Sequence, residues 1–203
     1  MKNHSSNENK SPFVTDIKCV LPEWIDYNGH MNVAYYTLVF DEALDDFLDE
    51  IGIGESYVKI NHNGPYALQA NYHYLSELLE GENFRVKIFL VDVSDKCFHA
   101  ALEIVSEKDY KVAAVCEQIT MNVDLTKRKA NQYPNWVRAK FDKMRQPSPI
   151  FVKIRSFTRR SLTFFFLLSF SKASYCPWPC TPAAPRIHDS TKRLRGGKGD
   201  GVT

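Results

Sequence analysis

The chain has 203 residues, enough for one domain with a tail, and its hydrophobic content of 44% is ordinary for a globular protein. Its net charge of +2 is unevenly spread, because residues 147–203 hold ten Lys/Arg and two Asp/Glu, which leaves −6 on residues 1–146. A mildly acidic folded part argues against a nucleic acid as partner.

The chain begins with a polar segment, residues 1–11, that we expect to be disordered. It has no apolar stretch of the kind found in secretory signals, and it lacks the arginine typical of transit peptides. Residues 13–21 have the composition of a strand, which Pro22 ends. We therefore expect a cytoplasmic protein whose folded domain begins near residue 12.

The loop over residues 24–32, Trp-Ile-Asp-Tyr-Asn-Gly-His-Met-Asn, is the most informative stretch of the chain. Asp26 stands three residues before Gly29, and the loop leads directly into a predicted helix that Asn32 can cap. A helix start offers unpaired N–H groups and partial positive charge, so a carboxylate held there can attack a carbonyl or activate water against it. Alternatively, Asp26 is only a turn residue in an Asp-x-x-Gly loop.

Apolar residues at spacing three and four predict a helix over residues 33–51, about 28 Å long. Gly52 can end it, and the acidic residues on its other face indicate a solvated edge. Glycine, asparagine and proline predict a loop over residues 52–65.

Four strand-like segments follow, separated by short turns that require antiparallel neighbours: residues 67–75, 84–93, 97–105 and 111–123. With residues 13–21 they make about five strands around one long helix, which predicts an α+β fold. A final short helix is predicted over residues 135–144.

Residues 146–203 differ from the rest of the chain, because proline and serine are frequent and the charge is strongly positive. We expect a disordered or non-native tail, for example translated non-coding sequence; a basic tail that binds a membrane or RNA is the alternative. Its longest apolar run, residues 162–170, is too short to span a bilayer, so we expect no membrane association. The five cysteines have the spacing of neither a disulfide framework nor a zinc site, and we expect no metal.

These features resemble the hotdog-fold acyl-CoA thioesterases of the hydroxybenzoyl-CoA thioesterase-like family, and most closely the betainyl-CoA thioesterases of carnitine and betaine metabolism. The similarity covers roughly residues 13–145 and rests on four segments: residues 22–32, 40–43, 72–78 and 113–118. It implies a hotdog domain over residues 12–145, an antiparallel sheet of about five strands wrapped around one long helix. It further implies hydrolysis of a short acyl-CoA, with betainyl-CoA as a candidate, and no cofactor beyond the coenzyme A of the substrate.

The resemblance also assigns roles around the loop. In this family, an Asp at the position of Asp26 acts as nucleophile or as general base, and the sequence does not separate these routes. The backbone N–H groups of Val33 and Ala34 would hold the oxyanion, where one donor typically contributes ~3–4 kcal/mol. Glu42, ten residues into the helix, is a second candidate carboxylate.

Two polar residues of the loop have alternative roles. His30 either contacts the substrate or Asp26, or it stabilises the turn. Asn32 either caps the helix alone or also contributes to the site. One departure from the family lies outside the loop: Asn122 stands where a histidine is frequent, which we expect to affect substrate preference. The segment after Gln146 has no counterpart in the family.

Aromatic and basic residues complete the candidate site. A quaternary ammonium acyl group would gain about 0.5–2 kcal/mol per cation–π contact with an aromatic wall, although core packing accounts for the same residues: Trp24, Tyr35, Tyr36, Tyr72 and Tyr74. Three basic residues after the last strand either meet the phosphates of coenzyme A or form a solvated turn: Lys127, Arg128 and Lys129.

The resemblance implies a homodimer or homotetramer, because hotdog domains pair through their sheets with the site between protomers. Two other functions stay open. One is a hotdog dehydratase, which would use a His/Glu pair, whereas here the Asp precedes the Gly-His pair. The other is a non-catalytic protein that binds acyl-CoA or a quaternary amine and keeps the same aromatics and helix start.

Overall fold

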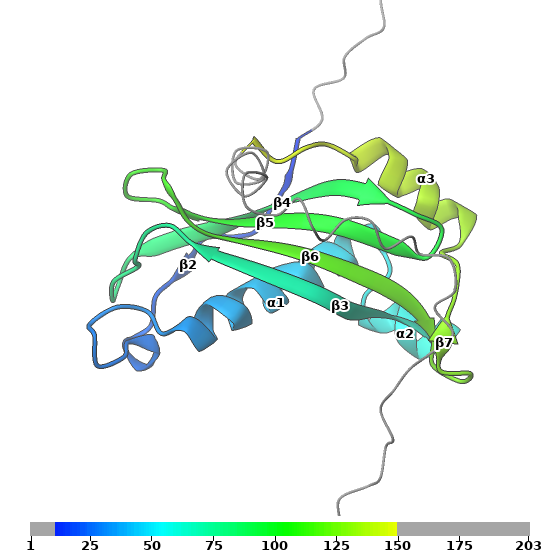
Figure 1. Cartoon of the computed structure of the whole chain (residues 1–203), viewed down its shortest axis with the longest axis horizontal. Helices are drawn as coiled ribbons and strands as arrows, with labels where there is room; N and C mark the ends of the chain where they lie inside the picture. The colour runs from blue at the N-terminus through cyan, green and yellow to red at the C-terminus, as the bar shows by residue number, and fades with distance from the viewer. Residues whose placement is uncertain (1–10, 150–203) are drawn as a thin grey trace, which may run out of the picture. The chain divides into compact units, whose positions relative to one another are not determined.

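The computed structural model describes residues 11–149 (Figure 1). Its first half contains strands β1 (Phe13–Val14) and β2 (Lys18–Cys19), the 3₁₀ turn η1 (Pro22–Trp24), and helices α1 (Val33–Ile51) and α2 (Glu55–Asn61). Its second half contains β3 (Asn63–Tyr74), β4 (Asn83–Val93), β5 (Cys97–Ser106), β6 (Val112–Asp124), β7 (Lys129–Ala130) and helix α3 (Asn135–Met144). The predictions for residues 1–10 and 150–203 lie outside the described residues.

The strands form one antiparallel sheet in the order β1-β4-β5-β6-β3, with β2 also paired to β4 and β7 to β6. Helix α1 packs against one face of this sheet (Figure 1). Strand β3 pairs only with β6, so its other edge is open among the described residues. The predicted α+β architecture, a sheet of about five main strands around one long helix, is confirmed.

Helix α1 occupies the predicted residues because its pattern and its ends agree. One face is buried against the sheet: Tyr36, Val39, Phe40, Ala43, Leu44, Phe47, Leu48 and Ile51. The Asn32 side chain accepts a hydrogen bond from the Ala34 N–H at its start, and Gly52 ends it in the left-handed conformation (φ 83°). Lys140 donates to the Ile51 carbonyl at 2.9 Å, which places a cation at the negative end of the helix.

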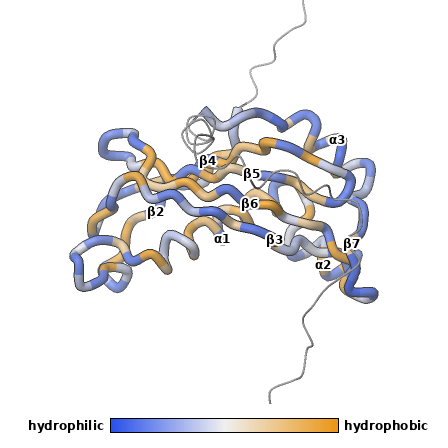
Figure 2. Tube along the Cα trace, viewed as in Figure 1, coloured by the Kyte–Doolittle hydropathy of each residue, from blue (hydrophilic) through white to orange (hydrophobic). Residues whose placement is uncertain are grey.

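Several buried aromatic rings pack together near the end of α1. Phe98 of β5 lies 6.3 Å from Phe47 of α1 and 5.5 Å from Phe141 of α3, measured between ring centroids. Hydrophobic stretches run along β4, β5 and β6, and the turns between them are hydrophilic (Figure 2). Helix α3, predicted over residues 135–144, is confirmed and closes this end of the core through Val137 and Phe141.

Two predictions about the first half were wrong in detail. The strand predicted over residues 13–21 is divided into β1 and β2, and Thr15 between them bonds to Val86 of β4 through its N–H and its hydroxyl. The loop predicted over residues 52–65 contains α2, and β3 begins at Asn63. Pro65 fits inside β3 because an edge strand tolerates a residue without an N–H donor.

The first residues of the predicted tail contact the sheet. The Gln146 N–H donates to the Leu90 carbonyl at 2.7 Å, and the buried Ser148 hydroxyl donates to the Glu103 carboxylate. The ordered structure therefore extends past residue 145. Within residues 11–149, no helix is both long enough and apolar enough to cross a membrane.

Candidate active site

The Asp26 loop is a short hairpin that is closed at its base. Ile25 and Met31 form an antiparallel bridge, the Asp26 N–H donates to the His30 carbonyl, and the Gly29 N–H donates back to the Asp26 carbonyl. Gly29 has φ 84°, a conformation that glycine adopts without the cost paid by other residues. These bonds give the loop one defined shape.

The loop is anchored on both sides. The Met31 N–H donates to the Leu78 carbonyl at 2.8 Å, and the Met31 side chain is fully buried in the core. On the other side, the Asn32 N–H donates to the Trp24 carbonyl at 2.8 Å. The loop is thus fixed between the start of α1 and the segment that follows β3.

The Asp26 carboxylate lies at the start of α1, as the sequence predicts. Its Oδ1 accepts from the Asn28 N–H at 2.8 Å, and its Oδ2 accepts from Asn32 Nδ2 over a longer distance of 3.4 Å. Asn32 is also the helix cap, so one amide group separates the carboxylate from the helix end. Asp26 is half-buried, which leaves the carboxylate accessible to a substrate.

The first N–H groups of α1 are not equivalent. The Ala34 N–H donates to Asn32 Oδ1 at 2.9 Å and the Tyr35 N–H donates to the Asn32 carbonyl at 3.0 Å. Within residues 11–149, no partner accepts from the Val33 N–H. Of the two oxyanion donors that the sequence suggested, the structure therefore leaves Val33 open and engages Ala34 in the cap.

The other polar candidates have structural contacts. His30 Nδ1 lies 3.1 Å from the Met31 carbonyl, so the ring contacts the backbone of its own loop. Glu42 accepts from Lys18 of β2 at 2.7 Å, which directs it toward the β2 side of α1. These contacts favour the turn role for His30 and an ion-pair role for Glu42.

The five predicted aromatic residues form two groups rather than one wall. Trp24 and Tyr35 stack at 5.3 Å on the side of β4. On the side of β3, Tyr74 lies 5.3 Å from Tyr36 and 6.5 Å from Tyr72. The second group reaches the open edge of the sheet, because Tyr74 is 48% exposed.

Two groups near these rings are structural. The Tyr36 hydroxyl accepts from the Leu78 N–H at 3.1 Å, and burial raises the pKa of Tyr36 against the effect of this bond. Burial raises the pKa of the Cys116 thiol to about 12. Cys116 therefore stays protonated at neutral pH and is unsuited to be a nucleophile.

Comparison with known proteins identifies the family of this chain. A family model described as the thioesterase-like superfamily matches residues 20–141. The chain belongs to the thioesterase-like superfamily. Its hotdog fold and its assignment as a thioester hydrolase, both predicted by the resemblance, are confirmed.

Relatives in this superfamily are similar in sequence. The chain is 31% identical over 106 residues to the betainyl-CoA thioesterase of Pseudomonas aeruginosa, across 52% of this chain and 67% of the relative. It is 30% identical over 117 residues to the L-carnitine dehydrogenase/betainyl-CoA thioesterase of Rhizobium meliloti, across 58% of this chain and 23% of that longer protein.

Solved structures share the fold. A Staphylococcus aureus protein in complex with CoA superposes with a TM-score of 0.64 at 26% identity, over 68% of this chain and 88% of that one. The 1,4-dihydroxy-2-naphthoyl-CoA thioesterase of Synechocystis gives a TM-score of 0.59 at 15% identity, over 66% and 98%.

Asn122, the departure from the superfamily pattern, is a structural residue here. It is 2% exposed, and its Nδ2 donates to the carbonyls of Asn131 and Gln132. These bonds hold the segment after β7 against β6. In this position the amide supports the fold, and in its own protomer it lies at the opposite end of β6 from the Asp26 loop.

The predicted basic turn also lies far from Asp26 within one protomer. Register pairs Asn63 with Asp124 and Tyr74 with Ala114, so β6 leads away from the Asp26 loop toward the turn. A strand of 13 residues spans about 40 Å. Lys127 pairs with Asp124, and Arg128 donates to the Tyr66 hydroxyl at 2.8 Å, over the edge strand β3.

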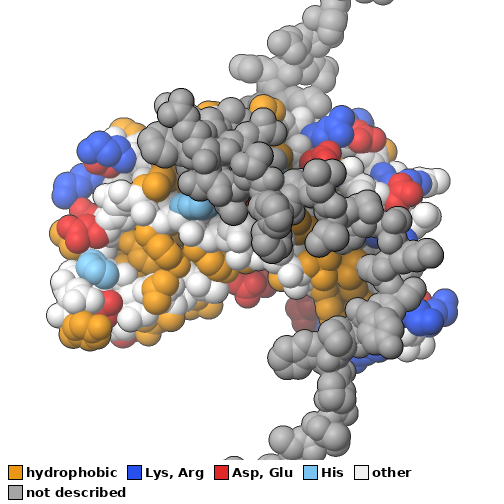
Figure 3. Space-filling view, viewed as in Figure 1, with side chains coloured by type: hydrophobic (Ala, Val, Ile, Leu, Met, Phe, Trp, Pro, Cys, Tyr) orange, Lys and Arg blue, Asp and Glu red, His pale blue; other side chains and the backbone are white. Residues whose placement is uncertain are grey.

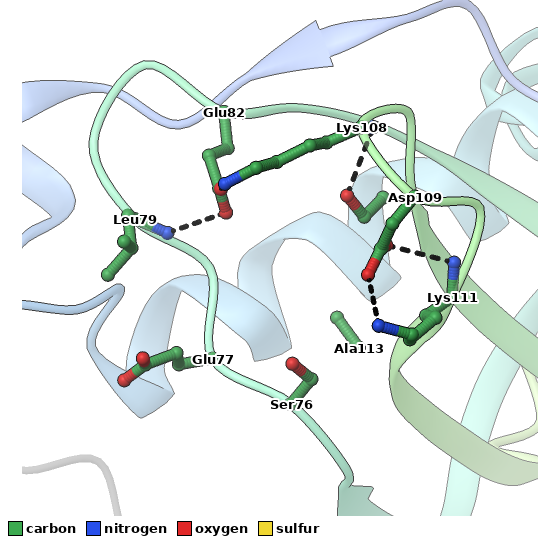
Figure 4. Close-up of a pocket in the computed structure, with 9 residues that line it drawn as sticks. Ser76, Glu77, Leu79, Glu82, Lys108, Asp109, Lys111 and Ala113 are labelled. Atoms are coloured by element: carbon green, nitrogen blue, oxygen red, sulfur yellow. Dashed lines mark hydrogen bonds and ion pairs between the residues drawn. The ribbon is translucent and has the colours of Figure 1, made fainter.

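The sequence did not indicate a polar pocket beside the segment around Leu78, whose carbonyl bonds the Met31 N–H of the Asp26 loop (Figure 4). It lies between the segment after β3 and the β5–β6 turn and is lined by Ser76, Glu77, Leu79, Glu82, Ser106, Lys108, Asp109, Lys111 and Ala113. Lys108 pairs with Glu82 at 2.9 Å and Lys111 with Asp109 at 2.7 Å, and the close-up shows each pair turned together. Both lysines thus already have an anionic partner within this part of the chain. The signal that could have predicted the pocket is the strand order, because it brings the segment after β3 and the β5–β6 turn to the same end of the sheet, where α1 begins.

Metal ligation has no obvious place in this part of the chain. Among residues 11–149, His, Cys, Asp and Glu side chains form no group of three suited to a metal ion.

Proposed function

We propose that this thioester hydrolase acts on a short acyl-CoA, with betainyl-CoA as the first candidate, and that Asp26 is its reacting carboxylate. The observation that carries the proposal is the position of Asp26, held by Asn28 and Asn32 beside the start of α1. The names of the Pseudomonas aeruginosa and Rhizobium meliloti relatives support betainyl-CoA as the candidate substrate.

Two routes use the same geometry. In the first, an Asp26 oxygen attacks the thioester carbonyl carbon, the C–S bond breaks, and the thiolate leaves with the electron pair; water then cleaves the mixed anhydride and restores the carboxylate. In the second, Asp26 takes a proton from water, whose oxygen attacks the carbonyl, and the leaving thiolate receives a proton. Neither route uses a metal or redox cofactor, so coenzyme A enters only as part of the substrate.

The Val33 N–H is the proposed donor to the oxyanion. It is the first N–H of α1 and makes no bond within the described residues, and the Val33 side chain is 55% exposed. A preorganised donor of this kind typically contributes ~3–4 kcal/mol to transition-state stabilisation. The positive end of the helix dipole acts in the same direction.

The rings on the β3 side are the proposed contact for the acyl group. Tyr72 and Tyr74 stack with an interplanar angle of 12°, and Tyr74 is half-exposed. A quaternary ammonium group against these faces would gain about 0.5–2 kcal/mol per ring. Trp24 and Tyr35 lie on the other side of α1 and are less suited to this contact.

The open edge of β3 is the proposed interface of a homodimer. Tyr66 and Leu68 are 41% and 49% exposed there, and Figure 3 shows hydrophobic side chains along this edge of the sheet. A long exposed edge with apolar side chains favours pairing with another strand. Antiparallel pairing about the middle of β3 would place residue 63 of one copy opposite residue 74 of the other.

This pairing gives the basic turn a role across the interface. Arg128 already lies over β3 through its bond to Tyr66, and β3 ends at Tyr74, near the Asp26 loop. In the dimer, the partner subunit's Arg128 would approach the Asp26 end of the first protomer, where it could pair with a phosphate of coenzyme A. The prediction for residues 127–129 then holds between protomers rather than within one.

Leu68→Arg tests the interface. We expect the purified protein to shift from dimer to monomer, because a two-fold axis near Leu68 would bring the two new charges together. Light scattering coupled to gel filtration measures the mass. Ile60→Arg, at an exposed position on α2, is the matched control and should stay dimeric. A dimer that survives Leu68→Arg would place the interface elsewhere.

Thiol release from a panel of acyl-CoAs tests the function. We expect turnover of betainyl-CoA or of another short acyl-CoA, with an enzyme blank subtracted because Cys19 is exposed. Binding without release of thiol from any thioester would instead support a non-catalytic protein. Hydration of an enoyl-CoA without thiol release would support a dehydratase.

A further inference from the structure

The Asn32 side chain serves two structures at once. Its Oδ1 accepts from the Ala34 N–H at 2.9 Å and its Nδ2 lies 3.4 Å from Asp26 Oδ2. The orientation of the amide is fixed, because the reverse orientation would set NH₂ against an N–H donor and the amide oxygen against a carboxylate. The cap therefore decides which group faces Asp26.

The Asn32 backbone is equally restrained. Its N–H donates to the Trp24 carbonyl at 2.8 Å and its carbonyl accepts from the Tyr35 N–H at 3.0 Å. With both backbone groups and the side-chain oxygen bonded, the direction of Nδ2 is set by the fold before a substrate arrives.

The two oxygens of Asp26 are held unequally. Oδ1 accepts a short bond of 2.8 Å from the Asn28 N–H within the loop, whereas Oδ2 has only the long contact of 3.4 Å to Asn32 among the described residues. A carboxylate oxygen with a strong donor is less available to react than one with a weak donor. The geometry thus distinguishes an anchored oxygen, Oδ1, from a reactive one, Oδ2.

We propose that Asn32 is a positioning residue that couples the α1 cap to Asp26, holding the carboxylate by Nδ2 so that Oδ2 is the atom that reacts. This inference rests on the proposed function, since it assigns the role of a neighbour of Asp26 in that site. It applies to the nucleophile and to the general-base route alike, because both need a fixed and ionised oxygen.

Asn32→Ser separates the two tasks. Serine caps helices about as well as asparagine, so the melting temperature should change little. Its short hydroxyl does not replace the donor to Asp26, so we expect kcat to fall about 10- to 100-fold with a smaller change in KM, as for the loss of a hydrogen bond to a charged group. Asn32→Ala removes both the cap and the donor, so it should lower both the melting temperature and kcat.

Asn32→Asp gives a second readout. It keeps the cap but sets a second carboxylate against Asp26 in place of a donor, so kcat should fall at least as far as in Asn32→Ser while the melting temperature again changes little. Carbon-13 NMR of the Asp26 carboxyl group at the assay pH should show a changed chemical shift in both Asn32→Ser and Asn32→Asp, because the donor to Oδ2 is lost. The shift should persist with His30→Gln, which removes the titratable ring from the same loop.

The outcomes separate this inference from the proposed function. If Asn32→Ser keeps the wild-type kcat and the carbon-13 signal of the Asp26 carboxyl group stays in place, Asn32 is only a helix cap and the inference is overturned. If the wild type cleaves no thioester, the proposed function fails, and the carbon-13 signal of the Asp26 carboxyl group still decides whether Asn32 holds the carboxylate.

Discussion

Replacing Asp26 with Asn is expected to lower kcat/KM for the best acyl-CoA by about 10³-fold, within the range for loss of a positioned base and below that for loss of a nucleophile. Asparagine has nearly the same shape, and its oxygen can still accept from the Asn28 N–H. The loop should therefore keep its conformation while the charge at the start of α1 is lost. Thiol release under kcat/KM conditions measures the effect, and the melting temperature reports the fold.

Asp46→Asn is the matched control for this substitution. Asp46 is an exposed carboxylate on α1, away from the helix start, so its loss should leave the rate within about twofold of the wild type. Turnover that survives Asp26→Asn would remove Asp26 from the chemistry. A separate experiment on the wild type distinguishes the two routes: a covalent acyl group trapped on Asp26 and detected by mass spectrometry would indicate the nucleophile route.

Phe98→Ala is expected to cost about 3–5 kcal/mol in the free energy of unfolding, the range for a fully buried Phe. Phe98 is 1% exposed, and its ring contacts Phe47 and Phe141, so the cavity would open between α1, β5 and α3. Since whole domains are stable by only about 5–15 kcal/mol, this loss would be a large fraction of the total stability. Urea unfolding followed by circular dichroism measures the loss.

Phe98→Leu and Ile60→Ala bracket this result. The leucine variant keeps most of the buried volume and should lose clearly less than the alanine variant. Ile60 is 77% exposed, so Ile60→Ala should stay within about 0.5 kcal/mol of the wild type. A loss below 1 kcal/mol for Phe98→Ala would mean that α3 does not depend on this ring.

The long helix could be predicted to the residue because independent signals agree. The apolar spacing gives its face, while Asn32 and Gly52 give its two ends. Helix α2 has none of these signals: it has seven residues, its N-cap Gly54 offers no side-chain bond, and none of its residues is fully buried. Its place is decided by packing, in which Tyr57 contacts Trp136 of α3.

The candidate site was only partly predictable for a similar reason. The loop pattern indicated Asp26, because local bonds among neighbours in sequence hold it in place. The pocket around Lys108 and Lys111 depends on two turns that only the sheet brings together. The separation of the aromatic residues into two groups depends on which side of α1 each ring faces, and the sequence pattern does not specify this.

The two ends of the sheet carry different kinds of residues. Its α3 end holds the dense aromatic core of Phe98 and Phe141, whereas its other end carries the Asp26 loop and the turns of the polar pocket. Changes to the exposed residues of these turns should therefore cost little stability. An engineer who wants a new substrate range should vary the exposed pocket residues, such as Glu77, Lys108 and Lys111, and keep both the buried Leu78 and the distant aromatic end.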